Sequence, residues 1–314
     1  MASIRRKIKE VLRQKWVPSF LFKQYFDFQN KKKRQQLLDA LNSGTPLIDL
    51  IGKGEKEHWS HRIKEVTQCP DNAAIEYHES AGKVIDGHII MHNGLQLDPA
   101  SYYGYGMLEL LRANKGVHEP QEEKLFQEVL KVLPKDRKIT MLELGAYWSF
   151  YSLWFLKMNP NAACYMVEPE RLNLWYGKQN AAINKLNGTF VHAGIGDKVD
   201  TAKNITTVDA ICKKNNIEFL DILHSDIQGF ELDMLKGSEK ILSENRVGYI
   251  FISTHSNELH EDCYQLLKNK YKFELIASAN LDESYSWDGI LLMKNPSYTK
   301  LAPINISKRS TVST

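Results

Sequence analysis

The 314-residue sequence lacks the features that mark disulfide-rich and membrane-spanning proteins. Its cysteines form no C-x-x-C pair and show no metal-site spacing, so neither a disulfide framework nor a cysteine metal centre is indicated. No apolar run approaches the roughly 20 residues of a membrane span, and the basic N-terminus has no apolar signal-peptide core. We expect a cytoplasmic protein with reduced, buried thiols at Cys69, Cys164, Cys212 and Cys263.

Glycine is scarce where a nucleotide-binding loop would need it. Residues 139–144 form a short apolar run followed by Gly145, which predicts a buried strand and a turn. A dinucleotide site would continue as G-x-G-x-x-G, and this turn has only one glycine. A pyrophosphate cradle is therefore disfavoured, and the pattern favours a nucleoside without phosphates, of which S-adenosylmethionine is the obvious one.

The segment after this turn completes a β-α-β unit. Residues 150–158 lack glycine and proline and fit a helix, and residues 162–167 form a second apolar run that ends on Glu168. An acid at the end of the second strand can accept both hydrogen bonds from a ribose diol. The unit therefore predicts a nucleoside site at Gly145 and Glu168.

Charge is distributed unevenly along the chain. Residues 1–34 carry eleven Lys or Arg and two acids, so the remainder has a net charge of −6 within an overall +3. A mildly acidic body disfavours nucleic acid as the partner. Residues 3–16 predict a basic amphipathic helix, which can lie on an anionic membrane or contact a partner such as a glycosyltransferase. Packing on its own body or on a second copy of the chain is the simpler interpretation.

The next segments predict less regular structure. Residues 24–41 fit a second helix, and glycines and prolines punctuate residues 42–115. Short strands at 84–85 and 88–91 predict a hairpin through Asp86 and Gly87. The aromatic segment 102–106 suits either a binding loop, whose rings stack on sugars or bases, or an ordinary packed loop.

Strands and helices alternate after residue 168. Helices are predicted over 171–186, 208–214, 230–242 and 259–270, and strands over 189–193, 219–226, 247–253, 273–277 and 286–293. This alternation predicts a parallel sheet with helices on both faces. We expect an α/β, Rossmann-like, doubly wound fold with a mostly parallel seven-stranded sheet, an antiparallel edge strand and a helical N-terminal extension.

Two blocks of this region resemble a known family. Val-Glu-Pro-Glu-Arg-Leu-Asn at 167–173 and Asp-Ile-Leu-His-Ser-Asp-Ile-Gln-Gly-Phe-Glu-Leu-Asp-Met-Leu-Lys-Gly at 221–237 are similar to blocks of the FkbM S-adenosylmethionine-dependent methyltransferases. The sequence departs from the family at three places: His224 replaces a lysine, Gln228 replaces an acid, and residues 147–149 replace Asn-x-Gly. The resemblance divides the chain into a basic helical extension (1–41), an irregular α+β segment for substrate or oligomer contacts (42–117), a methyltransferase domain (118–295) and a tail (296–314).

The resemblance implies a set of cofactor contacts. Glu143 and the backbone around Gly145 would hold the amino-acid end of S-adenosylmethionine, Glu168 its ribose, and Gly194 and Ile195 its adenine. Gln121 belongs to a helix that can help cover the cofactor. The full expected cofactor set is Gln121, Glu143, Gly145, Ala146, Tyr147, Ser149, Glu168, Gly194 and Ile195.

Methyl transfer also needs a group that removes a proton from the acceptor. Asp226, His224 and His255 lie at or near the ends of adjacent predicted strands and are the candidate catalytic bases. Asp226 and His255 could alternatively bind a divalent cation that acidifies the acceptor hydroxyl. Glu231, one turn into the next helix, is a further candidate.

The sequence therefore predicts an S-adenosylmethionine-dependent O-methyltransferase, cytoplasmic or peripheral at the inner membrane surface. The resemblance favours a sugar hydroxyl of a glycan or polysaccharide as acceptor. A small-molecule hydroxyl, as in a natural product, is the alternative. A non-catalytic assembly module that keeps the fold is the third hypothesis, motivated by His224 and Gln228. A homo-oligomer is compatible with each.

Overall fold

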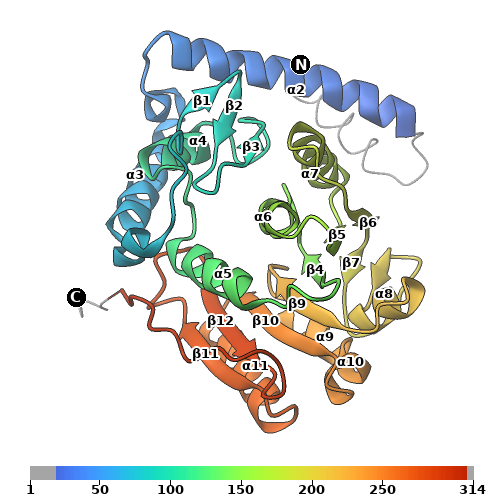
Figure 1. Cartoon of the computed structure of the whole chain (residues 1–314). Coiled ribbons are helices and arrows are strands. Elements are labelled where there is room, and N and C mark those ends of the chain that lie inside the picture. Colours follow the sequence, from blue (N-terminus) through green and yellow to red (C-terminus); the bar gives the residue numbers. More distant parts are fainter. Residues whose placement is uncertain (1–18, 310–314) are drawn as a thin grey trace.

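A central seven-stranded sheet organises the molecule (Figure 1). The computed structural model describes residues 19–309, apart from the side chains of 19–23 and 53. The sheet order is β11-β12-β10-β9-β4-β5-β6, and all neighbours pair in parallel except those of β12. The bounds are β4 (Thr140–Leu144), β5 (Ala163–Glu168), β6 (Thr189–His192), β9 (Leu220–Ser225), β10 (Val247–Thr254), β11 (Glu274–Ala279) and β12 (Gly289–Lys294).

The strand order confirms the predicted doubly wound fold. The order reverses between β4 and β9, so the carboxyl ends of these two strands flank a topological switch point, where such sheets bind ligands. The antiparallel strand, β12, lies second from the edge, between β10 and β11. The predicted strand at 286–293 begins later, at Gly289, which leaves Asp288 in the loop just before it.

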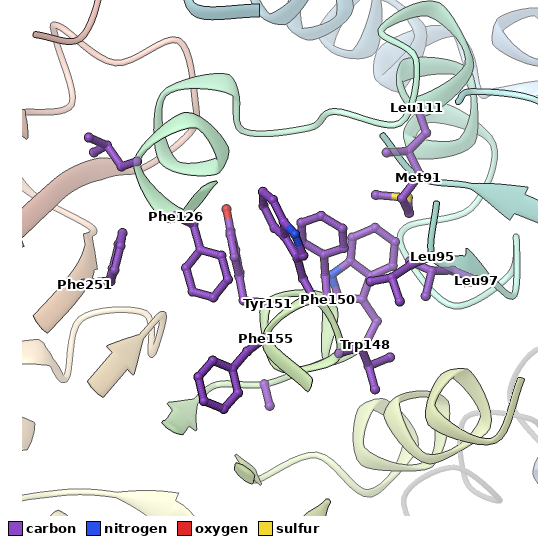
Figure 2. Close-up of a cluster of buried hydrophobic side chains, with 14 of the residues drawn as sticks. Met91, Leu95, Leu97, Leu111, Phe126, Trp148, Phe150, Tyr151, Phe155 and Phe251 are labelled. Atoms are coloured by element: carbon purple, nitrogen blue, oxygen red, sulfur yellow. The ribbon is translucent and has the colours of Figure 1, made fainter. Parts of the chain in front are cut away.

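Helices cover both faces because strand residues alternate between two cores. Met141 and Phe251 point into one cluster with α5 and α6, whereas Leu142 and Ile250 point into the other with the later helices. Figure 2 shows rings of the first cluster, with Phe126, Tyr151 and Phe251 grouped between helix and sheet. The helices are α5 (Pro120–Val132), α6 (Phe150–Met158), α7 (Arg171–Ile183), α8 (Val208–Lys214), α9 (Glu231–Lys236), α10 (Glu239–Ser243) and α11 (Asn257–Asn269). A two-stranded sheet joins β7 (Gly194–Ile195) to β8 (Ile205–Thr206).

The segment before residue 118 packs on the first of these cores. Its Leu37, Trp59 and Leu97 belong to the same buried cluster as Phe126 and Phe155, so the predicted boundary at 117/118 separates residues that share one core. The hairpin at 84–91 is confirmed and gains a third strand. The elements are α2 (Ser19–Asn42), η1 (Leu47–Leu50), α3 (Lys53–Gln68), η2 (Pro70–Ala74), β1 (Val84–Ile85), β2 (His88–Ile90), β3 (Gln96–Leu97) and α4 (Tyr105–Ala113).

The long helix α2 runs past the hairpin to α7, where Phe26 contacts Trp175 with ring centroids 6.5 Å apart (Figure 1). The predicted basic helix at 3–16 lies outside the described residues. Among residues 19–309, none of the helices combines the length and apolar character that crossing a membrane requires. All four cysteines are free and buried, as expected.

Candidate active site

The carboxyl ends of four parallel strands meet at one edge of the sheet. β4 leads into Gly145, β5 ends on Glu168, β9 leads into Asp226 and β10 leads into His255. Because β12 is antiparallel, its amino end lies at the same edge and brings Asp288 there. Two adjoining cavities open at this edge, and they share Tyr102, His118, Glu119 and Asp226 in their walls.

The turn after β4 needs glycine for two reasons. Gly145 has φ +74°, and a Cβ on it would lie 1.7 Å from the backbone carbonyl oxygen of Asp226. Its amide and that of Ala146 both donate to the carbonyl of Val167 at 2.9 Å. The lone glycine therefore joins the turn to the β9 loop. Its amides are used within the protein, so a ligand meets the carbonyl and side-chain groups of this turn.

Glu168 lies where the sequence predicts a ribose-binding acid. The carboxylate is buried, and it accepts hydrogen bonds from the backbone amides of Tyr147 at 3.0 Å and Glu170 at 2.8 Å. Burial raises its pKa, and these two amides act in the opposite direction. Each carboxylate oxygen keeps further acceptor capacity, so Glu168 can hold a diol while the protein fixes its orientation.

Tyr147 and Ser149 have left-handed backbone conformations, which asparagine and glycine adopt more readily. Their φ angles are +41° and +66°, in the left-handed region that asparagine and glycine tolerate best. These are the two positions at which the FkbM pattern carries asparagine and glycine. The hydroxyl of Ser149 is buried without a hydrogen-bond partner among the described residues, which makes it a group that a bound ligand could satisfy.

The inner cavity next to this turn is almost filled by aromatic rings. It encloses about 30 Å³ between Glu143, Gly145, Tyr151 and His224, close to the share of liquid volume that one water takes, about 30 Å³. Tyr102 stacks on Trp148 with centroids 4.2 Å apart and contacts Tyr147 edge-on. The rings of Tyr102 and Trp148 therefore leave little free space beside Gly145.

Glu143 is a buried acid in the wall of the inner cavity. It accepts a hydrogen bond from the amide of Ser152 at 3.3 Å, and burial raises its pKa to about 7. It lies opposite His224 in the β4–β9 ladder. A carboxyl group that can be neutral or charged near neutral pH suits a wall that meets a charged ligand.

Two expected cofactor contacts are engaged elsewhere. Gln121 must be corrected, since its amide oxygen accepts from Tyr285 N and Ser284 Oγ while its amide nitrogen donates to the carbonyls of Ser307 and Glu283. It therefore fastens the C-terminal segment to α5 and has no free end for a cofactor. Ile195 packs in the second core with Val167, and Gly194 precedes it in β7.

The outer cavity measures about 200 Å³ and is rich in acids and aromatic rings. Its carboxyl groups come from Glu119, Asp226 and Asp288. Trp287 and Tyr103 keep 37% and 49% of their surface exposed beside these acids. Arg62 also lines the cavity, but it donates to the carbonyls of Tyr285 and His118, so its charge is held in the wall.

Asp226, His255 and Asp288 form one cluster in this cavity. The Nε2 atom of His255 lies 3.4 Å from Asp226 Oδ1 and 3.2 Å from Asp288 Oδ1, and its Nδ1 atom lies 2.6 Å from Glu231 Oε1. Burial lowers the pKa of His255, but the Glu231 hydrogen bond and then the Asp288 and Asp226 carboxylates outweigh it and raise the pKa to about 9. Burial raises the pKa of Asp288 to about 6.

His224 does not join this cluster. It lies in the wall of the inner cavity, with Nε2 2.7 Å from Glu122 Oε1 and its ring 4.4 Å from that of Tyr151. Burial lowers its pKa. Of the three candidate bases, Asp226 and His255 therefore converge on the outer cavity, and the expectation for His224 at that place is corrected because this histidine packs into the aromatic core.

Sequence reasoning missed several residues of the outer cavity. Asp288 lay within the predicted strand at 286–293, and Trp287, Arg62 and Glu119 were not singled out as site residues. The antiparallel direction of the last strand was a usable signal, because it brings residues that precede the strand to the active edge. Arg62 carried no such signal, since it lies on α3, in the segment for which no regular structure was predicted.

The residues at the inner edge fit S-adenosylmethionine in kind. Glu168 offers a fixed acceptor for a ribose, and Ser149 offers a hydroxyl without a hydrogen-bond partner among the described residues. When bound, the cofactor would supply an activated methyl group on a sulfonium. The chain's own residues would hold it at Glu168 and around Gly145.

The sequence match agrees with this site. Residues 198–275 match the family described as methyltransferase FkbM domain. The match includes Asp226, Glu231 and His255. The chain is an S-adenosylmethionine-dependent methyltransferase. No curated protein matches the methyltransferase chain.

Several solved structures are distantly similar to this methyltransferase. They include precorrin-6y C5,15-methyltransferase from Geobacter metallireducens (13% identity, 55% of this chain and 87% of that chain, TM-score 0.39). A second is ribosomal protein L11 methylase from Lactobacillus delbrueckii subsp. bulgaricus (13%, 64% and 84%, 0.41). A third is TrmK of M. capricolum in complex with S-adenosyl-homocysteine (11%, 55% and 69%, 0.37). The fold assignment rests on the strand order and not on these distant similarities.

Proposed function

We propose that this enzyme transfers the methyl group to a sugar hydroxyl of a glycan or polysaccharide. The observation that carries the proposal is the outer cavity, which sets exposed aromatic rings beside carboxylates at the edge that holds the cofactor turn. Aromatic faces pack on the apolar faces of sugar rings, and carboxylates accept hydrogen bonds from hydroxyl groups. The FkbM resemblance points to the same acceptor class.

The aromatic wall of the outer cavity combines rings from the segment before residue 118 with Trp287 from the loop before β12. Trp287 stacks on His58 with centroids 5.3 Å apart and an interplanar angle of 18°, and it contacts Trp59 and Tyr103 edge-on. The guanidinium of Arg62 lies 5.1 Å from its ring centroid. These contacts hold the indole in place while 37% of the Trp287 surface stays exposed, so the ring is preorganised for contact with a sugar.

Asp226 is the residue we assign to proton removal. It borders both cavities, and its own backbone carbonyl lies against Gly145, so it stands between donor and acceptor. In the transfer, Asp226 takes the hydroxyl proton and the acceptor oxygen forms a bond to the methyl carbon. S-adenosylmethionine, when bound, would supply the methyl group, and its sulfur would keep the electron pair of the carbon–sulfur bond. Alignment and base catalysis are the two contributions that this reaction asks of the protein.

A test uses labelled S-adenosylmethionine with a panel of purified saccharides and polysaccharides. We expect transfer to at least one of them, and Asp226→Asn to lower its rate by roughly 10²- to 10⁴-fold, the range for a general base. Asp233→Asn, at an exposed site on α9 that pairs with Lys236, is the matched control and leaves the rate unchanged. Equal rates in wild type and Asp226→Asn would remove the assignment.

The small size of the outer cavity favours a second acceptor class. At about 200 Å³ it is smaller than typical ligand pockets of about 300–1,000 Å³, so one sugar ring or a small hydroxylated natural product would fill it. Transfer to small molecules but to no polymer would select this alternative. Cofactor binding without transfer to any acceptor would instead favour a non-catalytic assembly module.

A further inference from the structure

We propose that Asp226, His255 and Asp288 bind one divalent cation in the outer cavity, with Glu231 orienting the histidine. Each of the three residues offers one ligand atom, and these atoms all lie within 4.8 Å of one another. The cluster joins three separate strand ends, so the sheet itself sets its geometry. The inference rests on the proposed function only for what the cation does in catalysis.

Glu231 fixes which nitrogen of His255 faces the cluster. It is fully buried at the start of α9, and its Oε1 atom lies 2.6 Å from His255 Nδ1 and accepts from the amide of Gly229 at 2.9 Å. A carboxylate has no proton to donate, so Nδ1 carries the hydrogen. In the neutral imidazole the lone pair is then on Nε2, and it points toward Asp226 and Asp288.

In that orientation, the hydrogen-bond acceptor of His255 faces the acceptor oxygens of Asp226 and Asp288. In the neutral imidazole, the form that can bind a cation, the Nε2 lone pair would face two carboxylate oxygens, at 3.4 Å and 3.2 Å, and three electron-rich atoms repel one another unless a positive charge lies among them. A protonated imidazole offers one Nε2–H for two carboxylates, which leaves one of them without a full partner. A cation at the centre of the three atoms satisfies all of them together.

Nearby side chains do not supply the missing charge. Glu119 adds a further carboxyl group to the cavity. Arg62, its one guanidinium, donates to Tyr285, His118 and Ser286 and stacks on Trp287. Among the side chains that the structure describes, no lysine or arginine forms an ion pair with Asp226 or Asp288. Asp226 and Asp288 therefore share one histidine, His255, while Glu119 Oε2 lies 3.5 Å from His118 Nε2.

The ligand geometry suits Mg²⁺ or Mn²⁺. With bonds of about 2.1 Å, adjacent ligands of an octahedral ion lie about 3 Å apart, near the 3.2 Å and 3.4 Å that separate Nε2 from the two carboxylate oxygens. Two carboxylates and one imidazole are a set that Mn²⁺ accepts readily. A buried carboxylate behind a metal-binding histidine is the usual support for such a ligand, and Glu231 occupies that place.

The cation would act on the acceptor. Three protein ligands leave coordination positions for water or for the acceptor hydroxyl, whose pKa a bound cation lowers. The second oxygen of Asp226 then takes the released proton, and the resulting alkoxide oxygen bonds to the methyl carbon as the carbon–sulfur electron pair returns to sulfur. Asp226 is both a ligand and a neighbour of Gly145, so the activated oxygen forms next to the cofactor turn.

The test is binding of Mn²⁺ to the full chain after treatment with EDTA, followed by electron paramagnetic resonance and calorimetry. We expect one bound Mn²⁺ that Mg²⁺ displaces. Asp288→Asn and His255→Ala weaken binding at least tenfold, and Glu231→Gln weakens it by roughly 10- to 100-fold, as loss of a supporting carboxylate does. Asp282→Asn, in the same loop as Asp288 but exposed and bonded to Asn257, is the matched control.

Binding of S-adenosylhomocysteine to the same variants separates folding from metal binding. We expect unchanged affinity in Asp288→Asn, which shows that the cofactor half is intact. Absence of a stoichiometric Mn²⁺ site, or equal Mn²⁺ affinity in wild type and Asp288→Asn, would overturn the proposal. Methyl transfer to a saccharide that continues undiminished in EDTA would also overturn it while leaving the proposed function in place.

Discussion

The inner and outer halves of the cleft are built by different means. The inner half consists of backbone turns and stacked rings around about 30 Å³, and Glu168, which accepts from the amide of Tyr147 in the adjoining turn, is held by main-chain amides. The outer half encloses about 200 Å³, and its acids Asp226 and Asp288 are held by one histidine. Backbone geometry thus shapes the half proposed for the cofactor, whereas side chains from separate strands shape the half proposed for the acceptor.

Two histidine–glutamate pairs sharpen the contrast. His224 lies 2.7 Å from Glu122 inside the aromatic core, and burial lowers its pKa. His255 lies 2.6 Å from Glu231 at the mouth, where Glu231 and two further carboxylates outweigh burial and raise its pKa to about 9. The pKa values of the two histidines shift in opposite directions because one pair lies among aromatic rings and the other among acids.

The largest effect should come from placing a Cβ on Gly145, where the Asp226 backbone lies in contact. In Gly145→Ala the new Cβ would lie 1.7 Å from the carbonyl oxygen of Asp226, and φ is +74°. Since both groups are backbone, the turn or the β9 loop must shift. We expect a loss of more than about 4 kcal/mol of folding free energy, a size reserved for such clashes, and loss of S-adenosylmethionine binding. Chemical unfolding and calorimetry measure both.

Gly229→Ala is the matched control for this change. Gly229 follows Asp226 by three residues and has φ +97°, but a Cβ there would meet nothing within 4 Å. It should cost only the backbone strain of about 1–2 kcal/mol and leave cofactor affinity intact. Similar losses in the two variants would show that strain, and not the contact with Asp226, makes Gly145 necessary.

The sequence predicted the inner half better than the outer half. Gly145 and Glu168 belong to one β-α-β unit whose pattern is local, and the structure places both at the predicted edge. The outer cluster depends on the pairing of β10 with β12, which no local pattern encodes. Asp288 was missed for that reason, and Gln121 was misassigned because its partners lie far along the chain.

A substitution at Glu168 should have a smaller effect, which weakens cofactor binding and leaves Mn²⁺ binding unchanged. In Glu168→Gln one of the two amides, of Tyr147 or Glu170, must face the new NH₂ group, and the charged acceptor is lost. Hydrogen bonds to charged groups contribute about 1.5–3 kcal/mol, so we expect S-adenosylhomocysteine to bind roughly 10- to 100-fold more weakly in calorimetry. Mn²⁺ binding should not change. Glu170→Gln, one residue beyond Pro169 and exposed, is the control. Weakened Mn²⁺ binding would mean that the halves are coupled.

The smallest effect concerns Ser149, where stability and cofactor binding should change in opposite directions. Ser149→Gly relieves the left-handed strain at φ +66° and removes a buried hydroxyl without a partner, while glycine costs about 0.5–1 kcal/mol of chain entropy. We expect the free energy of unfolding, measured by thermal unfolding, to rise by about 1 kcal/mol. If the hydroxyl serves the cofactor, its loss should weaken S-adenosylhomocysteine binding roughly 2- to 10-fold. Ser149→Ala keeps the strain and removes only the hydroxyl, so it should reproduce the affinity loss with less of the stability gain. Unchanged affinity in both variants would remove Ser149 from the cofactor site and leave its left-handed turn a matter of folding alone.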